Sequence, residues 1–388
     1  MKNQYFSRKY IACVSSFFLF FMMRILFSSL VSVFLLDQGY SALTVSIVSA
    51  IALIASFFVV PIIGNYTDIY GTNKVSTLLL IISSITGAAF AFSKNLLLTG
   101  LLYCIVTICI NTLHPIIEKQ ATQTDFSYGS VRIWGTLGNA VGTQLGGILY
   151  QYISPQSVYI VFALTSIISL IGLEINSNGR IRSDINDAPA QNKKSLKPSV
   201  IFLLYIVVVF FFYAALDSKT LYLTAFLKES GFSVNEASTI LFFASLLEIP
   251  IVLFGGHLID KLSSKPLVIS CLILLGIQLS IYALFNSYVI IIIVTLATNS
   301  VVSMLYIMIN MKVISELIDS NHQLTALTVI TGVRSLAAVV GQTIGGQIID
   351  LYSYNHFFIL LSSYIILAIL LTLTIKFPKR NDNLHLYT

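Results

Sequence analysis

Long apolar runs, separated by short polar segments, recur along almost the whole of the 388-residue chain. A helix needs about 20 apolar residues to cross the hydrocarbon core of a bilayer. Strands of a membrane β-barrel would instead alternate polar and apolar positions, and these runs do not. The pattern therefore predicts twelve membrane-spanning helices, over 10–36, 43–63, 75–93, 96–116, 130–152, 157–176, 199–225, 236–259, 266–285, 288–312, 325–349 and 355–376.

The composition supports an integral membrane protein whose fold class is all-α. The chain is 56% hydrophobic and 10% charged, with a mean hydropathy of +0.89. Soluble domains carry about 25% charged residues, and no soluble fold has enough interior to bury this much apolar surface. The first apolar run is longer than a signal-peptide core and lacks a small-residue cleavage site, so we expect a retained span.

The distribution of lysine and arginine predicts the orientation in the cell (plasma) membrane. Cytoplasmic loops of membrane proteins carry an excess of these residues. With both termini cytoplasmic, the cytoplasmic segments hold most of the 22 lysines and arginines, whereas the opposite loops hold only Lys94 and Lys228. The net charge of +6 therefore reflects loop placement and is no sign of nucleic-acid binding.

Two motifs recur at similar offsets and indicate a duplicated six-helix unit. Segments 64–68 and 256–260 share Gly-x-x-x-Asp, and segments 142–147 and 341–346 share Gly-x-x-x-Gly-Gly. Internal repeats of this kind place the binding site at their interface, near the bilayer midplane. The predicted organisation is an N-terminal bundle over 1–176, a cytoplasmic linker over 177–198 and a C-terminal bundle over 199–388.

The Gly-x-x-x-Asp segments are candidate gating loops on the cytoplasmic side. Gly64 allows close helix approach, Asp68 can cap the next helix or bind a basic group, and Gly71 lies in the same loop. Gly256 and Asp260 stand at the matching places in the second half. An ordinary tight turn is the alternative for both loops.

The first of these loops resembles the signature loop of the major facilitator superfamily. The resemblance rests on Gly-Asn-Tyr-Thr-Asp-Ile-Tyr-Gly over 64–71, with Ile69 where the family usually has an arginine. The second copy has Lys261 at that place and Ser263 where a glycine is usual. The resemblance implies two pseudo-symmetric six-helix halves, the major facilitator fold, and secondary transport by alternating access.

Arg132 lies inside the apolar run 130–152, where a cation costs at least about 2.5–3.5 kcal/mol. We therefore expect its side chain to face a protein interior or a watery cavity. Residues 117–135 resemble the lactose permease group of oligosaccharide:proton symporters and the phenylpropionate permease branch. The resemblance implies that Arg132 hydrogen-bonds the substrate, with Trp134 nearby; a purely structural ion pair is the alternative.

Two further residues of the first half are substrate-binding candidates. His114 stands where the lactose permease group has a glutamate, and it is either a pH-sensitive ligand group or a hydrogen-bond partner of a neighbouring helix. Arg24 lies in the middle of the first apolar run, where that group has a glycine. Cations in the spans outnumber clear mid-span acids, which favours an anionic solute such as an organic acid or an acidic sugar.

In the second half the resemblance implies charge pairs. Asp217 keeps one of two acids of the seventh helix, Ala214 replaces the other, and Lys312 matches the basic partner of the retained acid. An Asp217–Lys312 pair is therefore expected. Arg334 matches a lysine whose acid is lost, so it is free for a substrate anion or pairs with Glu248 or Asp217.

Glu248 lies in the middle of the eighth apolar run and is the candidate proton carrier. Burial disfavours a charged carboxylate and a nearby cation favours it, so protonation can be linked to substrate binding. A structural ion pair and a substrate contact are the alternatives. Lys219, near the outer end of the seventh run, is expected to extend its ammonium to water.

No motif indicates an enzyme, a cofactor or a metal site. The chain has no phosphate-binding Gly-x-x-x-x-Gly-Lys loop, and the cysteines lie inside apolar runs without disulfide or zinc-ligand spacing. The expected partners are a small-molecule substrate, protons and the lipid bilayer, and the expected state is a monomer.

The sequence thus predicts a secondary active transporter, with proton symport of a sugar, an oligosaccharide or a small organic acid. Proton-driven export of sugars or drugs is the alternative, which a drug-susceptibility panel in a deletion strain would separate. A membrane sensor without transport is a third hypothesis and would show no solute flux in proteoliposomes.

Overall fold

The computed structural model describes residues 8–122, 126, 128–177, 200–285, 287–318 and 322–377. Their regular structure is helical throughout, so the predicted all-helical class is confirmed. The helices are α1 (Arg8–Ser28), α2 (Val31–Asp37), α3 (Ala42–Tyr70), α4 (Thr72–Phe92), α5 (Leu96–Thr122), α6 (Tyr128–Tyr152), α7 (Pro155–Ser177), α8 (Val200–Glu229), α9 (Val234–Leu246), α10 (Glu248–Lys261), α11 (Ser264–Leu284), α12 (Tyr288–Leu317), α13 (Gln323–Leu351) and α14 (Tyr354–Thr374).

Ten helical segments of the described chain are long and apolar enough to cross a membrane. The two other expected spans correspond to α6 and α7. Helix α6 is rich in glycine, threonine and amide side chains, which lowers its apolarity, and α7 contributes the shorter apolar stretch Pro155–Leu170. The twelve predicted spans thus all correspond to helices, in the predicted order.

Two predicted spans are interrupted. The first consists of α1 and α2, and the eighth consists of α9 and α10, which are separated by Leu247. Pro250 follows this break. A proline cannot donate a hydrogen bond to the carbonyl four residues earlier and clashes with it, and that carbonyl belongs to Leu246, where α9 ends. The interruption places Glu248 at the first position of α10.

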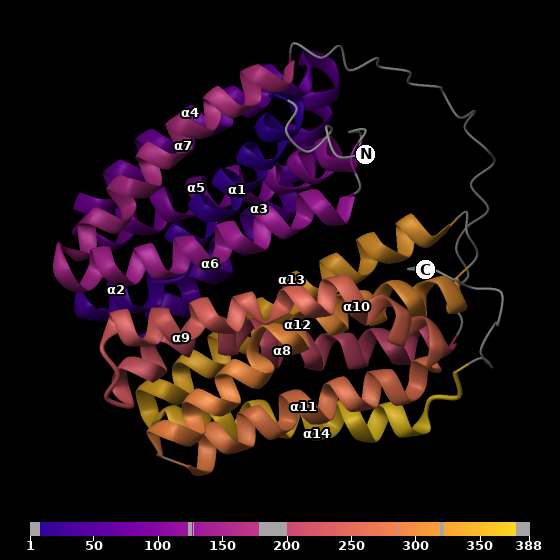
Figure 1. The fold of residues 1–388 in the computed structure, drawn as a ribbon. Helices are drawn as coiled ribbons and strands as arrows, with labels where there is room; N and C mark the ends of the chain where they lie inside the picture. Colours follow the sequence, from indigo (N-terminus) through magenta and orange to yellow (C-terminus); the bar gives the residue numbers. More distant parts are fainter. Residues whose placement is uncertain are drawn as a thin grey trace.

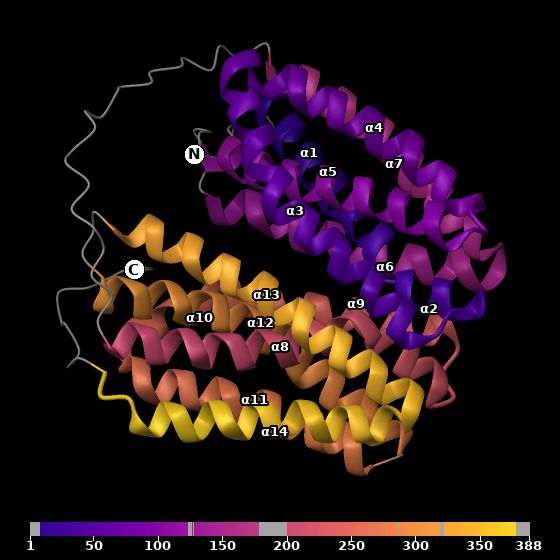
Figure 2. The ribbon, with the colours of Figure 1, turned by 180° about the vertical axis from the view of Figure 1, so that it is seen from behind.

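The helices form two halves that lie side by side (Figures 1 and 2). Helices α1–α7 make the first half and α8–α14 make the second. The closest packing between the halves joins α6 to α9 and α3 to α13. Most of the predicted linker, over 178–198, lies outside the described residues.

The two ends of the molecule differ. We call the end at which α1 begins and α14 ends the terminal face, and the end at which α2 ends and α3 begins the opposite face. The halves meet at the opposite face and diverge toward the terminal face (Figures 1 and 2).

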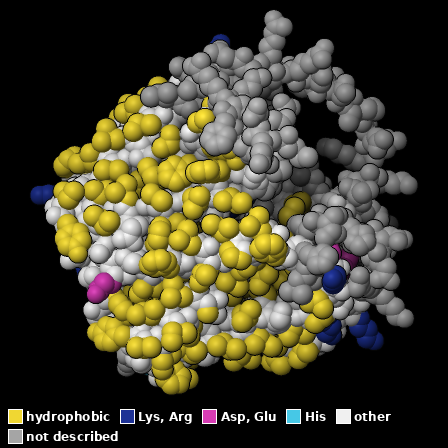
Figure 3. All heavy atoms as spheres, in the orientation of Figure 1, with side chains coloured by type: hydrophobic (Ala, Val, Ile, Leu, Met, Phe, Trp, Pro, Cys, Tyr) yellow, Lys and Arg dark blue, Asp and Glu magenta, His cyan; other side chains and the backbone are white. Residues whose placement is uncertain are grey.

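Hydrophobic side chains cover most of the molecular face shown in Figure 3, and charged side chains lie near its edges. Large apolar residues with more than half of their surface exposed occur in both halves, for example Ile85, Leu97, Ile293 and Leu370. A soluble protein rarely exposes apolar patches of this extent. The surface is that of a protein whose outer helices contact lipid.

The repeated glycines occupy matching places in the two halves. A Cβ atom on Gly142 would lie 2.8 Å from the carbonyl oxygen of Met22 in α1, and one on Gly341 would lie 2.5 Å from that of Ala214 in α8. These two glycines therefore allow close packing inside each half. Small residues let helix backbones approach closely.

The next repeated pair packs between the halves. A Cβ atom on Gly147 of α6 would lie 2.3 Å from the Cβ of Ser238 in α9. One on Gly346 of α13 would lie 2.3 Å from the Oγ of Ser46 in α3. The internal repeat seen in the sequence therefore corresponds to a structural symmetry between the halves.

Candidate functional site

The opposite face is closed by polar contacts between the halves. Lys228 of α8 donates to both carboxylate oxygens of Asp37 at 2.5 and 2.7 Å, and Tyr150 donates to the same carboxylate at 2.6 Å. Asp350 of α13 accepts hydrogen bonds at 2.8 Å from the backbone N–H groups of residues 42 and 43, at the start of α3. A carboxylate at a helix N-terminus is stabilised by the helix dipole.

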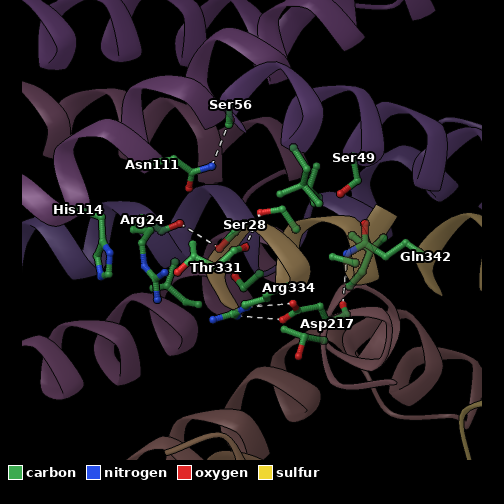
Figure 4. Close-up of a pocket in the computed structure, with 18 of the residues that line it drawn as sticks. Arg24, Ser28, Ser49, Ser56, Asn111, His114, Asp217, Thr331, Arg334 and Gln342 are labelled. Atoms are coloured by element: carbon green, nitrogen blue, oxygen red, sulfur yellow. Dashed lines mark hydrogen bonds and ion pairs between the residues drawn. The ribbon is translucent and has the colours of Figure 1, made fainter. Parts of the chain in front are cut away.

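A cavity of about 770 Å³ lies between the halves. Ligand sites for small molecules have volumes of this order. Both halves supply polar side chains to its wall, and Figure 4 shows most of them. Among them are Arg24, Ser28, Ser49, Ser56, Asn111 and His114 of the first half, and Asp217, Thr220, Asn299, Thr331, Arg334 and Gln342 of the second.

Arg24 belongs to α1, and its side chain forms part of the cavity wall (Figure 4). Its Nε is buried and has no hydrogen-bond partner. The guanidinium carbon lies 5.4 Å from the ring centroid of Phe21, within reach of a cation–π interaction. Among the described residues, no carboxylate lies at ion-pair distance from Arg24.

Arg132 lies in the protein interior, beside the cavity residues but not among those that line it. Its Nε is 3.9 Å from Oε1 of Glu118, and the same oxygen is 3.8 Å from Nε2 of His114. The guanidinium carbon is 4.8 Å from the centroid of the Phe21 ring. The geometry thus corresponds to the ion-pair alternative for Arg132, with His114 as the member of this group that lines the cavity.

Trp134 lies outside the cavity wall. Its indole Nε1 donates to the hydroxyl oxygen of Tyr10 at 3.4 Å, and 38% of the residue is exposed. This contact ties α6 to the start of α1. A direct role of Trp134 in substrate binding gains no support from this placement.

The expected Asp217–Lys312 pair does not form. Asp217 instead accepts two hydrogen bonds from Arg334, at 2.9 and 3.0 Å, which was one of the alternatives for Arg334. Lys312 is buried and donates to the carbonyl oxygens of Ile259 and Leu262, at the end of α10, and its Nζ lies 3.9 Å from Oε1 of Glu316 on its own helix. A cation is stabilised by the free carbonyl groups at a helix C-terminus, and this explains where the lysine binds.

Glu248 connects the two halves electrostatically. Its half-buried carboxylate lies within electrostatic range of Arg132 and Arg24, both of which belong to the first half, but makes no ion pair or hydrogen bond with either. It does not line the cavity. Because it lies at the α9–α10 break, its position depends on both helix segments.

The segments predicted to be gating loops lie at the terminal face. Gly71 has a φ of 89°, a left-handed conformation that favours glycine, and it ends α3 before α4 begins. The expected close approach at Gly64 is absent, because a Cβ atom there would meet nothing within 4 Å. The side chain of Asp68 is outside the described part. Gly256 and Asp260 are both buried.

The position of Lys219 differs from the prediction. The residue is fully buried, and its ammonium donates to Oε1 of Gln278 at 3.1 Å and to Oδ1 of Asn299 at 3.0 Å. The two amides solvate the charge, so the side chain does not extend to water. Asn299 also lines the cavity. Amide side chains inside the apolar runs 266–285 and 288–312 were the sequence signal for this network.

The match to known families decides the class of protein. The model of the Major Facilitator Superfamily matches residues 12–310 and 201–385. The chain belongs to the Major Facilitator Superfamily. It is therefore a multi-pass membrane transporter with a small-molecule substrate, and not an enzyme.

The chain is similar to one curated transporter in sequence and to solved transporters in fold. The uncharacterized transporter YwbF of Bacillus subtilis (strain 168) is 24% identical over 393 residues, covering 97% of this chain and 96% of that protein. A mutant of the nucleoside transporter NupG superposes with a TM-score of 0.78 at 15% identity, covering 95% of this chain and 100% of the other. A bacterial homologue of the iron transporter ferroportin, in an inward-facing state, gives 0.76 at 13% identity, covering 94% and 98%.

Proposed function

We propose that this transporter of the Major Facilitator Superfamily moves a small polar solute together with protons across the cell membrane by alternating access. With both termini in the cytoplasm, the terminal face is cytoplasmic. The contacts of Asp37 and Asp350 then close the external side, and the cavity belongs to an inward-facing state. Movement of one half against the other around a fixed site is how such repeats transport.

The observation that carries the proposal is the position of Glu248. This carboxylate belongs to the second half and lies within electrostatic range, though not at ion-pair distance, of Arg24 and Arg132 of the first. When ionised, it attracts the first half; when protonated, it no longer does. Binding of a proton thereby changes the balance between the two arrangements of the halves, which is what coupling requires.

The cavity wall supports a solute with several hydrogen-bonding groups. Hydroxyl and amide side chains from both halves surround it, and its volume of about 770 Å³ accepts a mono- or disaccharide-sized molecule. The resemblance of residues 117–135 to the lactose permease group supports a sugar or oligosaccharide. The solved structures of similar fold are a nucleoside transporter and a bacterial homologue of an iron transporter, and these names differ in solute, so the wall of this cavity is the better guide.

Uptake into proteoliposomes tests the proposal. A panel of labelled solutes, comprising lactose, glucose, uridine, glucuronate and benzoate, is offered with an acidic exterior and a neutral interior. We expect accumulation of at least one solute by the wild type. Glu248→Gln is expected to abolish accumulation driven by the proton gradient and to preserve exchange of labelled for unlabelled solute, since exchange needs no net proton movement.

Glu229→Gln is the matched control, because Glu229 is an exposed acid at the end of α8. It should accumulate solute like the wild type. Gradient-driven accumulation by the Glu248→Gln variant at the wild-type level would refute proton coupling through Glu248. Absence of flux for the whole panel in the wild type would refute the proposed solute class.

A further inference from the structure

The cavity holds a positive charge that the described residues leave without an ion-pair partner. Asp217 balances Arg334 through two hydrogen bonds. Glu118 lies next to Arg132. Arg24 has no carboxylate at ion-pair distance among the described residues, although its charge also interacts at longer range with Glu118 and Glu248.

Arg24 also lacks a hydrogen-bond acceptor for one of its N–H groups. Its Nε is buried without a hydrogen-bond partner, and burying a donor of a charged group without a partner is costly. The face of Phe21 offers only a cation–π contact at 5.4 Å. Guanidinium groups bind carboxylates through two parallel hydrogen bonds, one of which can come from Nε.

A second buried polar atom without a partner belongs to the same wall. Oε1 of Gln342 accepts no hydrogen bond, while the Nε2 of the same side chain donates to the backbone oxygen of Asp217 at 3.3 Å. Figure 4 shows Arg24 and Gln342 on opposite sides of the drawn pocket, with Ser28 and Thr331 between them. The wall thus contains a buried donor at one side and a buried acceptor at the other that the described residues leave without a hydrogen-bond partner, and Oγ of Ser29 is a third such atom.

We propose that the transported solute is a hydroxylated carboxylic acid with one negative charge, such as an acidic sugar, whose carboxylate binds Arg24. A hydroxyl group of the same molecule donates to Oε1 of Gln342. One negative charge suits the wall because Arg334 is already neutralised by Asp217, which leaves a single cation for the solute. This inference rests on the proposed function and names the chemical class of its substrate.

Ligand-dependent melting of the purified, detergent-solubilised protein tests the inference without any proton gradient. Three matched pairs are compared: glucuronate with glucose, galacturonate with galactose, and lactobionate with lactose. The acid of at least one pair is expected to raise the melting temperature and its neutral partner is not. Glucose 6-phosphate tests whether a doubly charged phosphate serves equally well, and binding of the phosphate in preference to every carboxylate would contradict the assignment.

Variants connect the effect to the site. Arg24→Gln is expected to weaken binding of the acid by about tenfold or more, as loss of a charge-assisted hydrogen bond does, and Arg24→Lys to weaken it less. Gln342→Met should weaken glucuronate binding and leave the effect of acetate unchanged. If the neutral sugars bind as well as the acids, or if no acid gives an Arg24-dependent shift, the inference is wrong.

A measurement without ligand checks the charge argument itself. Arg24→Gln should keep or raise the melting temperature of the ligand-free protein, because it removes a cation that lacks an ion-pair partner. Arg334→Gln should lower it, because it leaves Asp217 without its partner. A lower melting temperature for Arg24→Gln would assign Arg24 a structural role and overturn the inference.

The outcomes also separate this inference from the proposed function. Arg24-dependent binding of an acid without proton-driven uptake would refute the coupling and keep the substrate class. Proton-driven uptake of a neutral sugar by the Arg24→Gln variant would refute the substrate class and keep the coupling.

Discussion

Arg334 and Asp217 form a two-pronged ion pair that joins α13 to α8 in the cavity wall. Nε and Nη2 of the arginine donate to the two carboxylate oxygens at 3.0 and 2.9 Å. The guanidinium carbon also lies 4.6 Å from the ring centroid of Tyr213. The pair neutralises this side of the cavity, so we expect the charge at Arg24, in the other half, to select the solute.

Breaking this pair from either side should destabilise the protein. Asp217→Asn and Arg334→Gln each leave a charge without its partner, and we expect each to lower stability by about 1–2 kcal/mol, less than at a fully buried pair, since the arginine side chain is 45% exposed. The double variant should recover part of the loss, because neither charge is then unpaired. Melting temperatures of the four proteins in one detergent measure the coupling, and additive losses would show that the pair does not act as a unit.

The helix break before Pro250 should matter for coupling. Pro250→Ala restores a backbone N–H that can bond to the carbonyl of Leu246, so α9 and α10 are expected to join. The gain in stability should be smaller than the about 3 kcal/mol that a proline costs in a helix interior, because Pro250 lies in the first turn of α10. We expect a higher melting temperature together with weaker proton-driven accumulation, because Glu248 moves with the straightened helix.

Pro266→Ala is the control for that variant. Pro266 lies in the first turn of α11, where the missing N–H has no helical partner to lose. It should change neither property appreciably. Wild-type accumulation by the Pro250→Ala variant would show that the break is not required for coupling.

The repeated glycines between the halves should allow the two halves to make contact at the opposite face. A side chain on Gly147 or Gly346 would meet the neighbouring half at 2.3 Å in both cases, whereas one on Gly64 would meet nothing within 4 Å. Gly147→Val and Gly346→Val are therefore expected to separate the halves at the opposite face, and Gly64→Ala to leave them in place.

A cysteine introduced at Thr331 in the cavity wall reports this change, after replacement of the native cysteines. Its labelling from outside the cell by a membrane-impermeant maleimide should increase strongly in the two valine variants only. Equal labelling in all variants would contradict the role of these glycines in closing the external side.

Much of the fold could be predicted because hydrocarbon imposes strong constraints. Every backbone polar group in a bilayer needs a partner inside the protein, so a long apolar run has to be helical. The glycine repeat also predicted the symmetry, since Gly147 and Gly346 each pack against the other half where a side chain would not fit. The interruption at Leu247 was not predicted: Pro61 and Pro115 lie inside helices that continue, so a proline in a span does not by itself specify a break.

Charge pairing was harder to predict than helix positions. The sequence places Asp217, Lys312 and Arg334 in the spans, but the choice of partner depends on depth and rotation, which apolar periodicity does not specify. Lys312 binds carbonyl oxygens at the end of α10. Lys219 was expected to reach water, but it binds the side-chain amides of Gln278 and Asn299. In both cases the hydrogen-bond acceptors are neutral oxygens, which carry no charge signal in the sequence, although Nζ of Lys312 also lies 3.9 Å from Oε1 of Glu316.

The central claim is that the two halves exchange which end is closed, and distances between spin labels test it most directly. One label pair lies at the opposite face, on Gln38 and Glu229, which flank the contact between Asp37 and Lys228 and are both exposed. The second pair lies at the terminal face, on Tyr70 and Leu262, which are 61% and 42% exposed.

Double electron–electron resonance on both pairs is compared for the wild-type background and for Asp350→Asn, which weakens the hydrogen bonds to residues 42 and 43. The account predicts that the variant gains a longer distance at the first pair and a shorter one at the second, in equal proportion. An unchanged distance distribution at both pairs, or lengthening at one end without shortening at the other, would contradict alternating access.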